Sequence, residues 1–193
     1  MDVLWAVLLG LIQGLTEFLP VSSSGHLVLA GHLIGLPNTG LVFELLLHLA
    51  TLAAVIFYYR ADIAALLLAL PRACRAPLVG YREDDQVRLG LLIVIASVPT
   101  ALIGLTFKDQ FEALTAYPQA VGAALLVTAA LLLATHVIHT KERSLDLRAA
   151  LLIGVAQGLA ITPGVSRSGA TIAVALLLGI ATVKAARFSF LIS

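Results

Sequence analysis

The chain has 193 residues, of which 60% are hydrophobic and only 12% are charged, and its formal net charge is +1. A soluble domain carries about a quarter charged residues, so this composition excludes a fold that faces water on all sides. The near-neutral charge argues against a nucleic-acid partner, and the single cysteine, Cys74, excludes a disulfide within the chain. We therefore predict an all-α integral membrane protein, because a helix in lipid satisfies its own backbone hydrogen bonds.

The first segment, residues 3–36, is interrupted by polar groups too early to cross a bilayer. Residues 3–12 are apolar, but Gln13, Glu17 and Pro20 follow. Ten helical residues extend about 15 Å, which is half of a hydrocarbon core about 30 Å thick. We therefore predict a re-entrant helical hairpin over residues 3–36, with its turn near the middle of the membrane.

Three apolar segments follow that are each long enough to span a bilayer, at residues 41–59, 89–107 and 117–138. The first contains Glu44 and His48, which are four residues apart and therefore lie on one helix face. Their pattern leaves two roles open, packing within the bundle and support of a polar site. Three polar stretches connect these elements: residues 60–88, which could carry a surface helix, residues 108–116 and residues 139–148.

The sequence around the first turn recurs 144 positions later. Residues 13–26 read QGLTEFLPVSSSGH, and residues 157–171 read QGLAITPGVSRSGAT. An ungapped match of this length indicates an internal duplication. We predict a single membrane domain over 1–193, with a first repeat at 1–144 and a second at 145–193 whose own re-entrant hairpin covers 148–181. Because the second repeat has no counterpart of residues 50–144, we expect the sequence to be a piece of a longer protein.

The basic residues of the connecting stretches predict how the chain is oriented. Residues 60–88 contain five Lys or Arg and residues 139–148 contain three, whereas residues 108–116 contain only Lys108. The positive-inside rule places the first and third stretches in the cytoplasm. Since an odd number of spans separates the repeats, we expect the hairpins to enter from opposite faces as an inverted-topology repeat, with their polar turns meeting near the midplane.

The two predicted turns carry groups that suit an anion. Each turn leads into a helix, whose free N–H groups and positive dipole end attract phosphate. The glycines permit close approach of a ligand to the backbone, and the guanidinium of Arg167 can bind phosphate oxygens through two donors. We expect the following residues to bind substrate: Ser22, Ser24, Gly25, Ser166, Arg167, Ser168, Gly169 and Thr171.

The two repeats differ at positions where one of them carries an acidic, hydroxyl, imidazole or guanidinium side chain that could take part in a reaction. Three aligned positions change: Glu17 with Ile161, Ser23 with Arg167, and His26 with Ala170. Glu17 and Gln13, four residues apart on one helix face, could hold a hard divalent cation bridged to phosphates. A hydroxyl, a base and a cation together suit phosphoryl transfer. The alternative is that Glu17 and Arg167 form only a structural ion pair between the hairpins.

At these motifs the chain resembles the undecaprenyl-diphosphate phosphatase family, also called bacitracin-resistance proteins. The resemblance rests on residues 13–26 and 163–171, and residues 188–191 fit the family's continuation. It implies hydrolysis of undecaprenyl diphosphate to undecaprenyl phosphate and phosphate, which recycles the carrier lipid of peptidoglycan synthesis and gives bacitracin resistance. It further implies a multi-pass protein of the bacterial inner membrane whose site is accessible from the outer face. It also implies that the site uses a divalent cation, Mg²⁺ or Ca²⁺. Whether the protein forms a homodimer is left open.

The resemblance implies a role for each matching position. Ser23 would be the nucleophile and His26 its acid–base partner. Arg167 would bind the diphosphate, and Glu17 with Gln13 would form the cation-binding motif. Which group attacks is left open. A lipid phosphatase of the phosphatidic-acid type would want a histidine after Arg167, and residues 168–193 contain none. A transporter or flippase for a polyprenyl phosphate or another anionic lipid explains an inverted repeat but not the Ser23 cluster. A structural scaffold explains the hydrophobicity but not the polar turns.

Overall fold

The computed structural model describes residues 3–35, 41–136 and 143–193, and in these residues the protein is all helical apart from an isolated bridge between Arg143 and Ile180. The all-α class expected from the composition is therefore confirmed. The helices of the described residues are α1 (Val3–Thr16), α2 (Ser23–Leu33), α3 (Leu41–Tyr58), α4 (Arg60–Arg75), α5 (Pro77–Glu83), α6 (Asp85–Thr106), α7 (Lys108–Leu114), α8 (Pro118–His136), α9 (Leu147–Leu159), α10 (Arg167–Leu177) and α11 (Thr182–Ile192).

Within the residues that the structure describes, two helices, α6 and α8, are long and apolar enough to cross a membrane. They overlap the predicted spans at 89–107 and 117–138, although residues 137 and 138 lie outside the described residues. The predicted span at 41–59 corresponds to α3, which continues into α4 after a bend of 75°. Counting this bent pair as one span gives three. Many large apolar side chains of α3 point outward, including Val42 at 72% exposure, as expected of a helix that faces lipid.

The sequence predicted residues 60–88 as a loop that could carry a surface helix, and this stretch contains two helices, α4 and α5. α4 carries leucines between charged ends and buries Ala69, and it packs on α6 beside the buried Val87. Asp84 then begins α6, because its side chain accepts hydrogen bonds from the N–H groups of Gln86 and Val87. Likewise, the predicted loop at 108–116 contains α7. A search for long apolar runs overlooks such short amphipathic helices.

The buried core lies where α6 packs on α9, with α10 and α11 behind them. Close approach depends on Gly154 of α9, since a Cβ there would lie 2.1 Å from the carbonyl oxygen of Ala96 in α6. Thr100 of α6 also donates a hydrogen bond of 2.8 Å to the Gly154 carbonyl. The core residues are Leu92, Ala96, Ala149, Ala150, Ile153, Ala175, Ile180, Ala185, Phe188 and Ile192.

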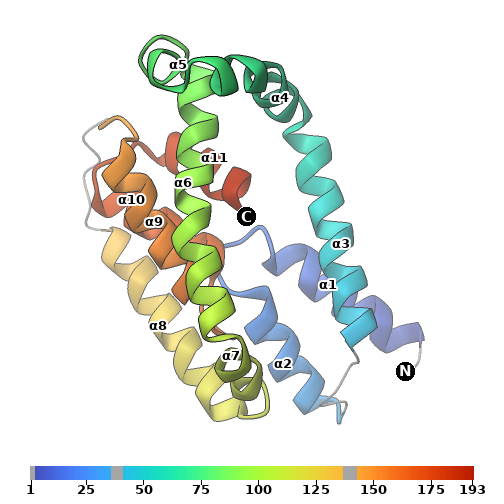
Figure 1. Ribbon diagram of the computed structural model, residues 1–193. Coiled ribbons are helices and arrows are strands. Elements are labelled where there is room, and N and C mark those ends of the chain that lie inside the picture. Colours follow the sequence, from blue (N-terminus) through green and yellow to red (C-terminus); the bar gives the residue numbers. More distant parts are fainter. Residues whose placement is uncertain (1–2, 36–40, 137–142) are drawn as a thin grey trace.

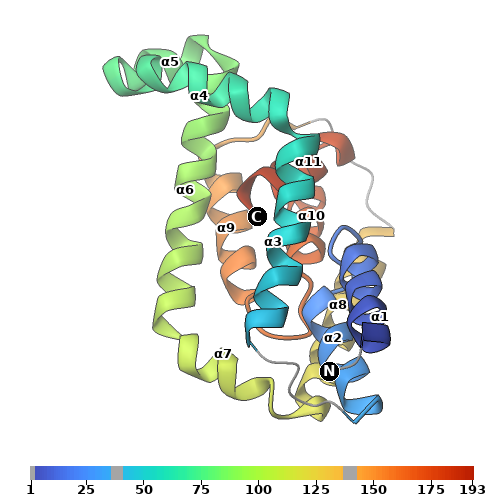
Figure 2. The same ribbon diagram turned by 90° about the vertical axis from the view of Figure 1, so that its right-hand side faces the viewer.

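The two hairpins run in opposite directions along the length of the molecule. α9 descends from the upper end to the middle and α10 returns upward, whereas α1 rises from the lower end and α2 returns downward (Figures 1 and 2). α4 and α5 lie across the upper end and α7 lies at the lower end (Figure 1). α8 packs against both α2 and α10. This arrangement brings the turns of the two hairpins together in the middle of the bundle.

Candidate active site

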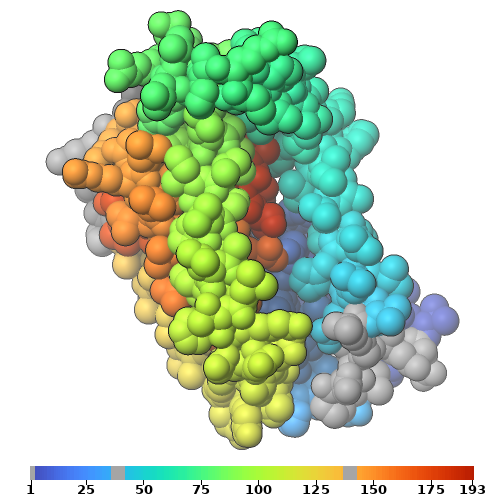
Figure 3. All heavy atoms as spheres, viewed as in Figure 1, coloured from blue at the N-terminus to red at the C-terminus, as the bar shows by residue number. Residues whose placement is uncertain are grey.

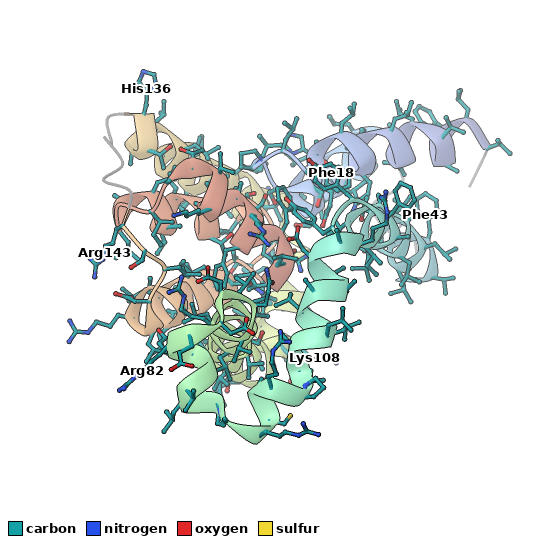
Figure 4. All side chains as sticks on the ribbon, turned by 90° about the horizontal axis from the view of Figure 1, so that it is seen from above. Phe18, Phe43, Arg82, Lys108, His136 and Arg143 are labelled. Carbon is teal, nitrogen blue, oxygen red and sulfur yellow. The ribbon has the colours of Figure 1, made fainter. Side chains whose placement is uncertain are left out.

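A cavity of about 460 Å³ lies where the two hairpin turns meet, and polar side chains from both turns line it. Figure 3 shows a recess between α3 and α6, with parts of the N-terminal and C-terminal segments at its back. The lining also includes the apolar Phe18, Val55 and Phe190. Seen from above, His136 and Arg143 point outward from the bundle, whereas Phe18 lies toward its middle (Figure 4). The cavity thus combines a polar centre with apolar walls.

Glu17 is the acceptor around which the first turn is organised. It follows the last residue of α1, and its Oε2 accepts hydrogen bonds from Gln13 Nε2, at 2.9 Å, and from the Ser23 hydroxyl at the start of α2. Glu17 and Gln13 share a helix face because they are four residues apart. Ser23 can donate to Glu17 because the chain reverses direction over residues 17–22. A hydroxyl that donates to a carboxylate is held in the orientation that a nucleophile and its base require.

Arg167 reaches the same carboxylate from the second hairpin. Its Nη2 lies 3.7 Å from Oε1 of Glu17, and its Nη1 donates to the carbonyl oxygen of Ser193 at 3.2 Å. The Arg167 side chain is 39% exposed and lines the cavity, so part of its guanidinium faces the open space. Glu17 balances the charge of this arginine while free donors remain for an anion.

Each turn ends in the same capping motif. The hydroxyl of Ser22 accepts from the N–H of Gly25 at 3.3 Å, and the hydroxyl of Ser166 accepts from the N–H of Gly169 at 3.0 Å. Ser22 has φ +68°, a conformation that is uncommon for a residue with a side chain and is typical of functional turns. The serines at Ser22 and Ser166 therefore set the starting points of α2 and α10, whose first turns face the cavity.

The glycines of the two turns lie where the hairpins touch. A Cβ on Gly25 would lie 2.9 Å from Cα of Gly164, and a Cβ on Gly169 would lie 3.0 Å from the carbonyl oxygen of Pro20. The space on the Cβ side of each glycine is therefore filled by the opposite hairpin. Their small size allows the two turns to touch.

Three further predicted site residues lie at the edge of this arrangement. His26 does not line the cavity; its Nδ1 lies 2.8 Å from the carbonyl oxygen of Ser22, so Nδ1 carries the proton. Thr171 is buried and pairs with the Ser189 hydroxyl of α11 at 2.5 Å, which ties α10 to α11. Gln13 is 1% exposed, and its Oε1 has no hydrogen-bond partner among the described residues.

Comparison with known proteins identifies the family of this chain. The family model described as bacitracin resistance protein BacA matches residues 6–193. Proteins named undecaprenyl-diphosphatase from Desulfatibacillum aliphaticivorans and Desulfosudis oleivorans are each 46% identical, over 97% and 100% of this chain and 71% and 73% of their own length. The protein of that name from Syntrophotalea carbinolica is 47% identical over 100% of this chain and 73% of its own length. This chain belongs to the BacA family.

The sequence analysis of this BacA family chain did not predict several polar residues in or beside the cavity. Thr16, Thr100 and Gln157 line the cavity, and Thr128 lies behind the second turn. Thr128 of α8 is buried, and its hydroxyl bonds to two backbone groups of the second turn. In the sequence it is a single hydroxyl within an apolar span, a pattern that usually indicates a bond to the helix's own backbone. Of the pair left open, His48 lines the cavity, whereas Glu44 is not among the lining residues.

Proposed function

We propose that this chain hydrolyses undecaprenyl diphosphate to undecaprenyl phosphate and inorganic phosphate, which recycles the carrier lipid of the bacterial cell wall and gives bacitracin resistance. The single observation that carries the proposal is the hydrogen bond from Ser23 to Glu17 at the edge of a cavity that Arg167 also lines. The family relatives named undecaprenyl-diphosphatase identify the substrate that fits this site. The apolar wall at Phe18, Val55 and Phe190 suits an isoprenoid tail.

In the proposed reaction, the Ser23 oxygen attacks the terminal phosphorus of the diphosphate and its proton passes to Glu17. The bond between that phosphorus and the bridging oxygen breaks, and undecaprenyl phosphate leaves. Water then hydrolyses the phosphoserine and the proton returns from Glu17. Arg167 and the N-terminal N–H groups of α2 and α10 stabilise the charge that develops on the phosphoryl oxygens. We assign the proton transfer to Glu17 and not to His26, because Glu17 accepts the Ser23 hydrogen bond.

The first turn also has the donor set for a divalent cation. Gln13 Oε1 is a buried oxygen without a hydrogen-bond partner in the described residues, and Nε2 of the same amide donates to the Glu17 carboxylate. Oxygen ligands of this kind suit Mg²⁺ or Ca²⁺. The described residues contain no cluster of three His, Cys, Asp or Glu, so the remaining ligands would be phosphate oxygens and water. Such a cation, when bound, would neutralise phosphate charge, and Gln13 and Glu17 would hold it.

The chain is a multi-pass membrane protein, and we place it in the bacterial inner membrane with its site open to the outer face. We propose that the hairpins are re-entrant halves of an inverted repeat. The opposite directions of α1–α2 and α9–α10 and the contact between their turns support this topology (Figures 1 and 2). The basic residues of α4 and α5 favour the cytoplasm for the upper end.

Release of phosphate tests the function against its main alternative. Purified protein in detergent should release inorganic phosphate from undecaprenyl diphosphate, and Glu17→Gln should abolish most of that release while His26→Ala should retain more of it. A transporter or flippase would instead move intact lipid between the leaflets of a vesicle without phosphate release. That outcome would remove the phosphatase from consideration, because the hairpin arrangement alone fits both functions.

A further inference from the structure

The second hairpin turn is held by a threonine of another helix. Thr128 of α8 is 3% exposed, and its hydroxyl donates to the carbonyl oxygen of Gly164 at 3.0 Å. The same hydroxyl accepts from the N–H of Ser166 at 2.9 Å. One side chain thus bridges the backbone two residues apart, immediately before Arg167, and uses both its donor and an acceptor position.

This pattern differs from that of two other threonines in the long apolar helices, although Thr100 of α6 also donates to another helix, at the carbonyl oxygen of Gly154. Thr135 of α8 donates to the carbonyl oxygen of Leu132, and Thr106 of α6 donates to that of Leu102, each within its own helix. Such bonds are the usual state of a hydroxyl in a membrane helix. The two bonds of Thr128 instead reach residues 36 and 38 positions away.

Gly164, which accepts one of these bonds, has a backbone conformation that other residues rarely adopt. Gly164 has φ +94°, and a Cβ there would lie 2.4 Å from the carbonyl oxygen of Val121 in α8. The turn therefore lies directly on α8, with no room for a side chain between them. Leu125 of the same helix approaches Gly25 of the first turn, since a Cβ on Gly25 would lie 3.0 Å from its Cδ2. α8 is thus a wall shared by both turns.

The hydrogen bonds of Thr128 also affect which backbone N–H groups of the second turn remain available to a ligand. The N–H of Ser166 is occupied by Thr128, and the N–H of Gly169 is occupied by the Ser166 hydroxyl. The N–H groups of Arg167 and Ser168, in the first turn of α10, have no partner within the helix, and both residues line the cavity. Their direction depends on where Ser166 begins the helix.

We propose that Thr128 is a positioning residue of the active site: its hydroxyl fixes the turn at residues 164–166 and so aims Arg167 and the N–H groups of Arg167 and Ser168 at the terminal phosphate. This inference rests on the proposed diphosphate hydrolysis and deepens it. Thr128 does not line the cavity, so it acts through the turn and not on the substrate. A shift of about 1 Å in groups that stabilise a transition state can reduce a rate about 10²-fold.

Three substitutions in the full chain separate positioning from packing. Thr128→Val keeps the shape and removes the hydroxyl, whereas Thr128→Ser keeps the hydroxyl and removes a methyl group. Thr135→Val makes the same change in the same helix at a hydroxyl that bonds only its own backbone. With undecaprenyl diphosphate we expect Thr128→Val to lower kcat about 10²-fold with little change in KM, and the other two variants to stay within about threefold of wild type.

A second measurement does not depend on turnover. Inorganic pyrophosphate should raise the midpoint of thermal unfolding of the wild type, Thr128→Ser and Thr135→Val proteins, and should raise that of Thr128→Val much less. If the wild type shows this shift but hydrolyses no undecaprenyl diphosphate, the proposed function fails while the anion clamp remains. If Thr128→Val keeps wild-type kcat and the full pyrophosphate shift, or if Thr128→Ser is as impaired as Thr128→Val, Thr128 is only a packing residue and our inference is wrong. Absence of the shift in the wild type also overturns it.

Discussion

Oε1 of Glu17 lies 3.7 Å from Nη2 of Arg167, and this ion pair joins the turns of the two duplicated hairpins. Neither repeat contains both residues, since Glu17 aligns with Ile161 and Arg167 aligns with Ser23. The duplication therefore supplied two similar turns, and their divergence placed a carboxylate on one and a guanidinium cation on the other. A site that needs both charges requires both hairpins to be in contact.

Arg167→Lys tests whether the shape of the cation matters as well as its charge. Lysine keeps the charge but loses the planar fork that can follow charge on two phosphate groups. We expect Arg167→Lys to lose most of kcat for undecaprenyl diphosphate and Arg167→Ala to lose essentially all of it. Phosphate release measures both, and Arg148→Lys, at an exposed position of α9, is the matched control.

Retained activity in Arg167→Ala would contradict a role for this arginine in binding the diphosphate. If Arg167→Ala keeps its activity and only lowers the midpoint of thermal unfolding, the arginine serves Glu17 as a structural partner. The anion clamp would then have to rely on the helix N-termini alone.

Glu17→Gln tests the assignment of the proton acceptor. Glutamine keeps the size of the side chain but is not a base, and it changes the hydrogen bonds to Ser23 and Gln13. We expect kcat to fall about 10²–10⁴-fold, as is typical when an acid–base group is removed. The dependence of the remaining rate on Mg²⁺ or Ca²⁺ should also weaken. His26→Ala, if it is more damaging than Glu17→Gln in the same assay, would return the proton transfer to the histidine.

The sequence predicted the elements whose signal is strong and local. α6 and α8 are long apolar runs, and the two turns were found because their motif is duplicated. A surface helix was considered within residues 60–88, but the bounds of α4, α5 and α7 were not predicted, since charged residues interrupt their apolar faces. Motif chemistry also predicted Glu17, Ser23 and Arg167 together, which the structure places within one network.

What the sequence could not provide is the packing between elements. Thr128 has no motif around it, and its role becomes visible only where α8 meets the second turn. Gly25 and Gly169 look like ligand-binding glycines in the sequence, but in the structure each one faces the opposite hairpin. Both cases depend on contacts between residues far apart in the chain.

Gly154→Ala tests the contact between α6 and α9. The added Cβ would lie 2.1 Å from the Ala96 carbonyl oxygen, a backbone atom that can move only with its helix. We expect the substitution to cost about 1–3 kcal/mol or more of stability, as overpacking does. Gly14→Ala in α1 is the matched control, because a Cβ there meets nothing within 4 Å. Thermal unfolding in detergent should separate the two, and equal midpoints would contradict the packing of α9 on α6.

Asp146 makes the start of α9 sensitive to acid. The N–H of Ala149 donates to its carboxylate at 2.8 Å, and this bond, with a further contribution from Arg143, lowers the pKa of Asp146 below its usual value. Its stabilising effect is therefore present above the unfolded-state pKa of about 3.9 and is lost as the pH falls through the lower folded-state value. Asp146→Ala should cost about 1 kcal/mol at neutral pH, as the loss of an N-cap does. Asp146→Asn should keep most of the cap while flattening the fall in thermal stability below about pH 4. An unchanged acid dependence in Asp146→Asn would assign that fall to other carboxylates.

Labelling of single cysteines tests the orientation on which the inverted repeat depends. α5 and α7 lie at opposite ends of the molecule, and the basic residues favour the cytoplasm for the end with α5 (Figure 1). In a Cys74→Ser background, Arg82→Cys should react with a membrane-impermeant maleimide only after the cytoplasmic face is opened, and Asp109→Cys should react in intact cells.

The native cysteine provides an internal control. Cys74 is exposed on α4, at the same end as α5, so the unmodified chain should label in the same way as Arg82→Cys (Figure 1). If positions 82 and 109 label from the same face, an even number of crossings separates α5 from α7 and α6 does not span the membrane. The two hairpins would then enter from one side, and the opposite directions of α1–α2 and α9–α10 would need another explanation.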